Sequence, residues 1–239
     1  MLLPWLPLIL LVATMPVFAV RTRGGPLDAN VAARPASALF GYWIRNWMIW
    51  VLTPVERILV RRRVSPDALN YAGLALGGLA GAAFIVGQLP LAAWLIALGG
   101  ICDILDGRLA RARGMATRYG EFLDSTLDRF AETFTFVGVG WYLSGSAWLV
   151  TATLLALGGS LLVSYTRARG EAVGVSYAGG LAQRAERVVV LAIATLLEPS
   201  VRGALGWAVG AIAVAAVGTA IYRTAFIARA LRSGSRVPR

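Results

Sequence analysis

The sequence predicts an all-α integral membrane protein, a six-transmembrane-helix bundle preceded by an interfacial amphipathic helix and an extra N-terminal hydrophobic helix. Three observations support this fold class. Of the 239 residues, 58% are hydrophobic, and the mean hydropathy of +0.69 exceeds that of soluble domains. Apolar runs of about 20 residues, the length that crosses a bilayer, recur along the chain. Arginines gather at the ends of these runs.

Six segments have the length and composition of membrane spans, with turn-forming stretches such as GQLP, LSGSA and LEPSVRG at their joints. They are residues 66–86, 91–109, 122–143, 147–165, 188–197 with its flanks, and 204–227. The arginines lie before the first span, after the second, fourth and sixth, and only Arg202 lies in a joint on the other side. We expect a multi-pass protein of a bacterial-type inner membrane. The positive-inside rule predicts that both ends of the bundle, and the joint between the second and third spans, are cytoplasmic, and the active site is expected on that side.

An aromatic stripe precedes the bundle within residues 37–62. Its residues recur at helical spacing and favour an interfacial helix on the cytoplasmic leaflet over a further span; they are Phe40, Trp43, Trp47 and Trp50. Pro54 is predicted to break this run.

Residues 1–20 have the length of a signal peptide but no positive n-region. Because RTRGG follows them, an uncleaved anchor with its N-terminus outside is favoured over a cleaved peptide. The predicted organisation is an anchor and linker at 1–36, the interfacial helix at 37–62, the six-helix domain at 63–231 and a basic cytoplasmic tail at 232–239.

The net charge of +11 does not indicate nucleic-acid binding, because the arginines flank apolar runs instead of covering one polar face. The membrane surface and its lipids are the expected partner. The single Cys102 excludes an internal disulfide and is interpreted as a small packing residue. Gly73, Gly77 and Gly81, four residues apart, predict close helix packing inside the bundle, with a homodimer as the alternative.

Four aspartates stand between two apolar segments. Asp103 and Asp106 are three residues apart, and Asp124 and Asp128 are four apart, so each pair projects from one helix face. The linker between the pairs holds two turn-compatible glycines, Gly114 and Gly120. We therefore expect an antiparallel return that brings all four carboxylates into one cluster.

Burying four unpaired carboxylates in a membrane would cost about 10 kcal/mol. Cations must offset that cost, either as an arginine network with Arg108, Arg111 and Arg129, or as bound metal. Oxygen-only ligands without histidine favour hard divalent ions. We expect two Mg²⁺ or Mn²⁺ ions, which can serve a phosphoryl displacement.

The residues beside the aspartates suit a phosphate ligand. Gly107 and Ala110 remove side-chain bulk next to the metals, and Arg111 supplies a planar donor fork. Close helix packing is the alternative explanation for the small residues. Since the chain has no histidine, the general base is expected to be a carboxylate.

The stretch from Asp103 to Asp128 resembles the signature of the CDP-alcohol phosphotransferase family. All eight positions of the pattern are met; they are Asp103, Asp106, Gly107, Ala110, Arg111, Gly120, Asp124 and Asp128. The resemblance covers about residues 40 to 231 and includes the six-helix plan and the interfacial helix. The first 35 or so residues are outside it.

The resemblance implies a two-metal enzyme that transfers a substituted phosphate from a CDP-linked donor, usually CDP-diacylglycerol, to an alcohol and releases CMP. It implies that Asp103, Asp106, Asp124 and Asp128 hold metal and that Asp128 is the base. It further implies a CDP site with Gly107, Ala110, Arg111 and Gly120. SPDALN is similar to the family's Pro-Asn-x-x-Thr element, keeping Pro66 but substituting Asp67 and Asn70, and we place Pro66 and Asn70 in the CDP site.

A basic cluster near the C-terminal half predicts an acceptor that carries its own phosphate. Its members are Arg167, Arg169, Arg184, Arg187 and Arg223. The segments SYTRARGE and QRAERVV resemble elements of the phosphatidylinositol phosphate synthases of this family, departing at Gln183 and Gly170. That resemblance implies inositol 1-phosphate as the acceptor. The alternative is a phosphatidylglycerol phosphate synthase, whose acceptor is phosphorylated as well. The positive-inside rule explains any single one of these arginines equally well.

Two other classes also use clustered acids. A membrane prenyltransferase carries its aspartate motifs in two separated parts of the chain, whereas all four acids here lie within 26 residues. A divalent cation transporter would use intramembrane acids too. It would not need Gly107, Ala110 and Arg111 at fixed offsets.

Overall fold

The structure, a computed structural model, describes residues 3–22, 41–177, 179–181 and 183–233. Within these ranges the chain forms eight α-helices and a short 3-10 turn, with no β-strand. The predicted all-α class is confirmed for this part of the chain. The predicted linker from residue 23 to 36, Phe40 of the aromatic stripe, and the basic tail from 234 onward lie outside the described residues.

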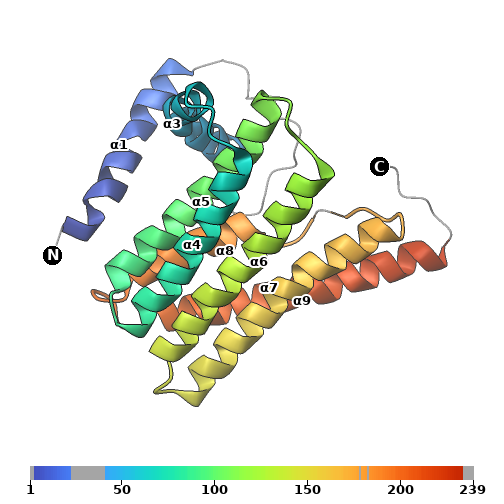
Figure 1. Cartoon of the computed structure of the whole chain (residues 1–239). Helices are drawn as coiled ribbons and strands as arrows, with labels where there is room; N and C mark the ends of the chain where they lie inside the picture. Colours follow the sequence, from blue (N-terminus) through green and yellow to red (C-terminus); the bar gives the residue numbers. More distant parts are fainter. Residues whose placement is uncertain (1–2, 23–40, 178, 182, 234–239) are drawn as a thin grey trace. The chain divides into compact units, whose positions relative to one another are not determined.

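Six helices occupy the segments predicted as spans (Figure 1). They are α4 (Pro66–Ile85), α5 (Leu89–Ala112), α6 (Arg118–Tyr142), α7 (Ala147–Ala172), α8 (Arg184–Leu197) and α9 (Ala204–Arg232). The apolar run of α7 ends near residue 165, but the helix continues to Ala172. Arg167 and Arg169 therefore lie on a helix and not in a connecting loop.

Four of these helices, α4, α5, α7 and α9, are long and apolar enough to cross a membrane. α6 carries more acidic and basic residues, and α8 has only 14 residues. At 1.5 Å per residue α8 extends about 21 Å, which is shorter than a hydrocarbon core of about 30 Å. The count of six spans therefore stays a prediction.

The chain divides into two compact units. The first contains Met1–Leu74 and Leu98–Asp128, and the second contains Ala75–Ala97 and Arg129–Arg239. All four predicted metal-binding aspartates belong to the first unit, and all five predicted acceptor arginines belong to the second.

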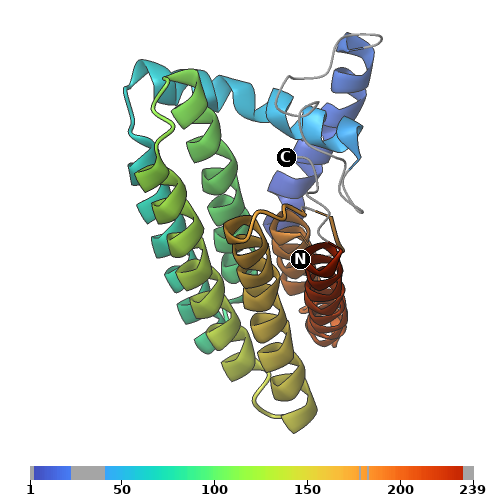
Figure 2. The same cartoon turned by 90° about the vertical axis from the view of Figure 1, so that its right-hand side faces the viewer.

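In the first unit, α1 (Leu6–Arg21) packs across the N-terminal half of α3 (Tyr42–Arg61), and the two helices cross (Figure 1, Figure 2). The Phe18 side chain is 1% exposed, and its ring centroid lies 5.5 Å from that of Trp43 and 5.7 Å from that of Trp50. The Trp47 indole nitrogen donates a hydrogen bond to Thr14 Oγ1 at 2.9 Å. The aromatic stripe of the predicted interfacial helix is therefore partly covered by α1.

The expectation that Pro54 breaks this helix is wrong, because α3 continues through it to Arg61. Pro54 removes only one backbone donor, so the surrounding helical turns can persist. One residue before it, Thr53 Oγ1 donates to the Ile49 carbonyl at 2.8 Å.

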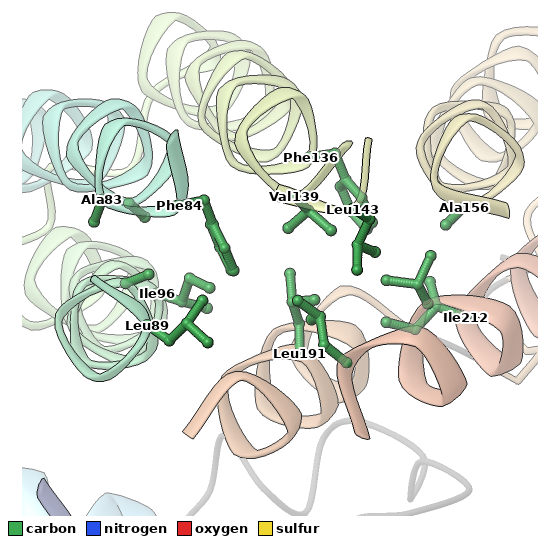
Figure 3. Packing of buried hydrophobic residues seen from close by; sticks show 14 of the residues in the cluster. Ala83, Phe84, Leu89, Ile96, Phe136, Val139, Leu143, Ala156, Leu191 and Ile212 are labelled. Carbon is green, nitrogen blue, oxygen red and sulfur yellow. The ribbon is translucent and has the colours of Figure 1, made fainter. Parts of the chain in front are cut away.

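The second unit is built around a continuous apolar core (Figure 3). Phe84 from α4, Val139 from α6 and Leu205 from α9 are fully buried in it, and α8 contributes Leu191. α7 and α9 lie side by side (Figure 1, Figure 2). They approach closely at Gly159, where a side chain would meet the backbone nitrogen of Val217 at 2.9 Å.

The glycine stripe of α4 packs inside the chain, as predicted. A methyl group at Gly77 would lie 2.6 Å from the Ala131 Cβ, and one at Gly81 would collide with the Phe134 carbonyl oxygen. In the first unit, a methyl group at Gly73 would lie 3.9 Å from the Cys102 Cβ, an ordinary contact distance, which agrees with a packing role for that cysteine. Small residues thus bring the α4 and α6 backbones together in the second unit.

This packing predicts that Gly81→Ala destabilises the protein by about 1–3 kcal/mol, because the new methyl group overpacks against backbone that cannot move aside. Gly78→Ala is the matched control, since its methyl group would lie 3.9 Å from the Phe134 ring. Thermal unfolding in detergent should show a lower Tm for Gly81→Ala only. Equal Tm values for the two variants would contradict the close approach.

Candidate metal and nucleotide site

Three carboxylates meet where the C-terminal half of α5 and the start of α6 face each other in the first unit. Asp103, Asp106 and Asp124 each offer an oxygen within 4.8 Å of the others. Asp106 is only 5% exposed, and the other two are partly buried. Asp128 lies one helical turn beyond Asp124 on α6 and is outside this group. The structure thus brings together three of the four predicted acids.

The tight connection between α5 and α6 makes this meeting possible. Gly114 adopts φ +64°, and the Met115 backbone nitrogen donates to the Ala110 carbonyl at 2.8 Å, closing α5 with a left-handed cap. Thr117 Oγ1 then accepts from the Gly120 nitrogen at 3.0 Å and caps α6. Gly114 forms the turn as expected, but Gly120 does not, because the cap starts the helix at Arg118.

The donor set of this cluster fits a hard divalent cation. All three groups are carboxylates, which Mg²⁺ and Mn²⁺ accept as ligands. Like charges at this separation repel one another, and burial of Asp106 increases that repulsion. A bound cation would relieve it, so these residues are suited to hold metal.

The helical turn after Asp106 places an arginine side chain beside a glycine. The Arg111 guanidinium folds back over Gly107, and its Nη1 lies 3.3 Å from the point where a Gly107 Cβ would stand. Any side chain at residue 107 would crowd that fork, so glycine keeps the backbone and Arg111 accessible to one ligand. Ala110, the other small residue of the motif, lies between Gly107 and Arg111 in the sequence.

The predicted α4 contacts also belong to the first unit. Pro66 begins α4, where its missing donor costs nothing, and Ser65 Oγ accepts from the Ala68 nitrogen at 3.2 Å. Asn70 lies one turn on and is 8% exposed.

Two arginines outside the motif connect this region to α3 and its end. Arg108 Nε donates to Glu56 Oε2 at 2.6 Å. Arg113 Nη1 donates to the Val64 carbonyl at 2.7 Å. Sequence reasoning missed Glu56; the only signal was an acid at the end of an amphipathic helix, which is equally typical of a solvated face.

In the second unit, Arg187 of the predicted acceptor cluster forms a buried ion pair. Its Nε and Nη2 donate to Glu132 Oε1 at 2.9 and 2.6 Å, and the side chains of Arg187 and Glu132 are 3% and 8% exposed. Glu132 Oε2 is buried without a hydrogen-bond partner among the described residues. Sequence reasoning missed Glu132, although a lone acid in the apolar run AETFTFVG was a usable signal.

Arg223 also bonds to the protein itself. It is 3% exposed, and its Nη1 and Nη2 donate to the carbonyls of Val163 at 2.6 Å and Gly179 at 2.9 Å. It thereby ties α9 to α7 and to the segment before α8.

The other three arginines of the cluster are closer to solvent. Arg167 is exposed and pairs with Glu171 at 2.9 Å, Arg169 is exposed, and Arg184 is partly buried in the first turn of α8. The N-terminus of α8 is capped by Gln183 and the buried Glu186. The five predicted acceptor arginines therefore differ: Arg187 and Arg223 are buried and bond to the protein, Arg167 and Arg169 are exposed, and Arg184 is partly buried.

The chain matches the CDP-alcohol phosphatidyltransferase family over residues 63–221. It is 36% identical over 213 residues to a phosphatidylinositol phosphate synthase of Streptomyces avermitilis, a match that covers 83% of this chain and 87% of that protein. It is 38% identical over 142 residues to an archaetidylinositol phosphate synthase of Methanothermobacter thermautotrophicus, covering 59% of this chain and 71% of that protein.

Solved structures of the phosphatidylinositol phosphate synthase of Mycobacterium tuberculosis share the fold. The structure with CDP-DAG bound superposes with a TM-score of 0.68 at 31% identity and covers 74% of this chain and 93% of the other. The complex with manganese and citrate gives a TM-score of 0.68 at 32% identity, covering 73% and 88%. The predicted resemblance is confirmed: the chain belongs to the CDP-alcohol phosphatidyltransferase family of membrane enzymes of phospholipid synthesis, and it is similar to phosphatidylinositol phosphate synthases.

Proposed function

We propose that this enzyme transfers the phosphatidyl group of CDP-diacylglycerol to inositol 1-phosphate and releases CMP, at a two-metal site. The observation that carries the proposal is the group of three carboxylates, Asp103, Asp106 and Asp124, within 4.8 Å of one another and next to the Arg111 fork. The active site would lie on the cytoplasmic side of an inner membrane. A homodimer is compatible with the proposal but is not required by it.

Both substrates have support. The Mycobacterium tuberculosis relative binds CDP-DAG, and its fold covers most of this chain. The exposed Arg167 and Arg169 and the partly buried Arg184 could bind the phosphate of an acceptor. A phosphatidylglycerol phosphate synthase stays the alternative, because its acceptor is phosphorylated as well; cation transport is more remote, since it would need no phosphate fork.

In the proposed reaction, the acceptor hydroxyl oxygen forms a bond to the phosphorus that carries diacylglycerol. The bond from that phosphorus to the bridging oxygen breaks, and CMP leaves with the electron pair. Asp128 takes the hydroxyl proton, and Arg111 with Gly107 holds the diphosphate. Two Mg²⁺ or Mn²⁺ ions, held by Asp103, Asp106, Asp124 and Asp128, would offset the charge on the phosphate oxygens.

Asp106→Asn should abolish Mn²⁺ binding and CMP release, because it removes a buried ligand charge. Mn²⁺ titration followed by electron paramagnetic resonance measures the binding directly. Glu121→Gln is the control, since Glu121 is exposed in the first turn of α6 and outside the carboxylate group. Unchanged Mn²⁺ affinity in Asp106→Asn would rule out a metal site at this position.

Asp128→Asn should lower kcat by about 10²–10⁴-fold, the usual contribution of a general base, with a smaller change in KM for the donor. CMP release from CDP-diacylglycerol under saturating acceptor measures both constants. A variant with wild-type kcat would exclude Asp128 as the base.

A panel of radiolabelled inositol 1-phosphate, glycerol 3-phosphate, free inositol and serine, each offered with CDP-diacylglycerol, tests the acceptor. We expect lipid product with inositol 1-phosphate. Preference for glycerol 3-phosphate would support the alternative synthase, and preference for an unphosphorylated alcohol would contradict the proposed role of the arginines.

The arginine cluster can be divided experimentally. Arg169→Gln should raise KM for the acceptor about tenfold without loss of stability, because it removes one charge-assisted bond.

Arg187→Gln should destabilise the protein by about 3–5 kcal/mol by leaving Glu132 buried and unpaired. Thermal unfolding tests this, and adding Glu132→Gln should restore most of the Tm. If the double variant stays as unstable as Arg187→Gln, the ion pair is not the cause.

A further inference from the structure

We infer that Glu56 is a positioning residue for the nucleotide-binding turn of α5 and acts through Arg108. The inference rests on the proposed function, since it concerns the CDP site. Both residues belong to the first compact unit, and their side chains join α3 to the last turns of α5.

The contact itself is short and sheltered. Arg108 Nε lies 2.6 Å from Glu56 Oε2, and the two side chains are 11% and 15% exposed. A charge-assisted hydrogen bond in such surroundings is stronger than one in water, and losing one partner leaves the other charge poorly solvated. The bond therefore restrains the rotamer of Arg108 and the distance between the helices.

Arg108 occupies a sensitive position on α5. It follows Gly107 directly and is two residues after Asp106. At about 100° per residue its side chain is rotated by about 200° about the helix axis from that of Asp106, so the two lie on nearly opposite faces of α5. Arg111 is three residues further on and projects beside it. The two arginine side chains therefore start from neighbouring positions on one face of α5.

Glu56 separates the roles of these two arginines. Its carboxylate balances the charge of Arg108 and holds that side chain against α3. Arg111 is then left over Gly107, where its Nη1 approaches the backbone. Without Glu56, repulsion between the two arginines would act on the fork that is expected to bind the diphosphate.

The space around the pair allows Arg108 to move if the bond is lost. A cavity of about 310 Å³ lies against α3 and is lined by Thr53, Glu56, Arg57, Val60, Arg61 and Arg108. Glu56 is the single carboxylate among these lining residues, which include three arginines. No other acid of this cavity can take its place.

The test compares Glu56→Gln, Arg108→Gln and the double variant in the full-length protein. Glu56→Gln should raise KM for CDP-diacylglycerol, and weaken CDP binding in the presence of Mn²⁺, by about tenfold, the effect of one charge-assisted bond. Arg108→Gln loses the same bond but also removes the charge that would repel Arg111, so its effect should be smaller. Values of kcat should change less than about threefold. The double variant should be no worse than either single one, because all three lose the same bond.

Arg61→Gln is the matched control, since Arg61 lines the same cavity but is exposed and, among the described residues, forms no ion pair with Glu56. It should leave CDP binding unchanged. The exchanged pair Glu56→Arg with Arg108→Glu should recover part of the affinity, and it keeps the test decisive if a single variant folds poorly.

Calorimetric titration with CDP distinguishes a failure of the positioning role of Glu56 from a failure of the proposed function. If the wild-type protein binds CDP and Glu56→Gln binds it equally well, the positioning role is wrong and the proposed function stands. If the wild-type protein binds no CDP with Mn²⁺ present, the proposed function fails and the role of Glu56 fails with it. Additive losses in the double variant, or equal loss in Arg61→Gln, would also overturn the inference.

Discussion

The meeting of three carboxylates on α5 and α6 is the interaction on which the functional part of this structure depends. Asp103, Asp106 and Asp124 repel one another within 4.8 Å, in a chain otherwise suited to lipid. Holding them there requires a tight reversal, provided by the left-handed Gly114 and the Thr117 cap. A site that confines negative charge in this way is prepared for divalent cations, and through them for phosphate.

The second unit also buries charged side chains, but it neutralises or hydrogen-bonds them within the protein. Glu132 is buried, and Arg187 neutralises it within the protein. Arg223 is buried too, and backbone carbonyls of α7 and of the segment before α8 accept its protons. Buried charged groups of the second unit are thus neutralised or hydrogen-bonded within the protein, which stabilises the fold.

The N-terminal segment has a structural connection to the family motif even though the family match begins at residue 63. Phe18 of α1 is enclosed by two tryptophans of α3, and the same α3 carries Glu56 near its other end. Glu56 bonds to Arg108, one residue beyond Gly107. Through this bond α3 contacts the motif helix α5 directly.

The all-α class, the positions of the bundle helices and the motif could be predicted from the sequence, because hydrophobic run length and spacing along a helix are local properties. The packing role of Gly77 and Gly81 could likewise be predicted from their spacing. Which arginines are buried in ion pairs and which are exposed depends instead on the packing of helices that are distant in the sequence. Arg108 and Arg187 find their acids 52 and 55 residues away, and helical periodicity contains no information about contacts at that separation. The same limit explains why Glu56 and Glu132 passed unnoticed, since an acid's role depends on the helix that packs against it.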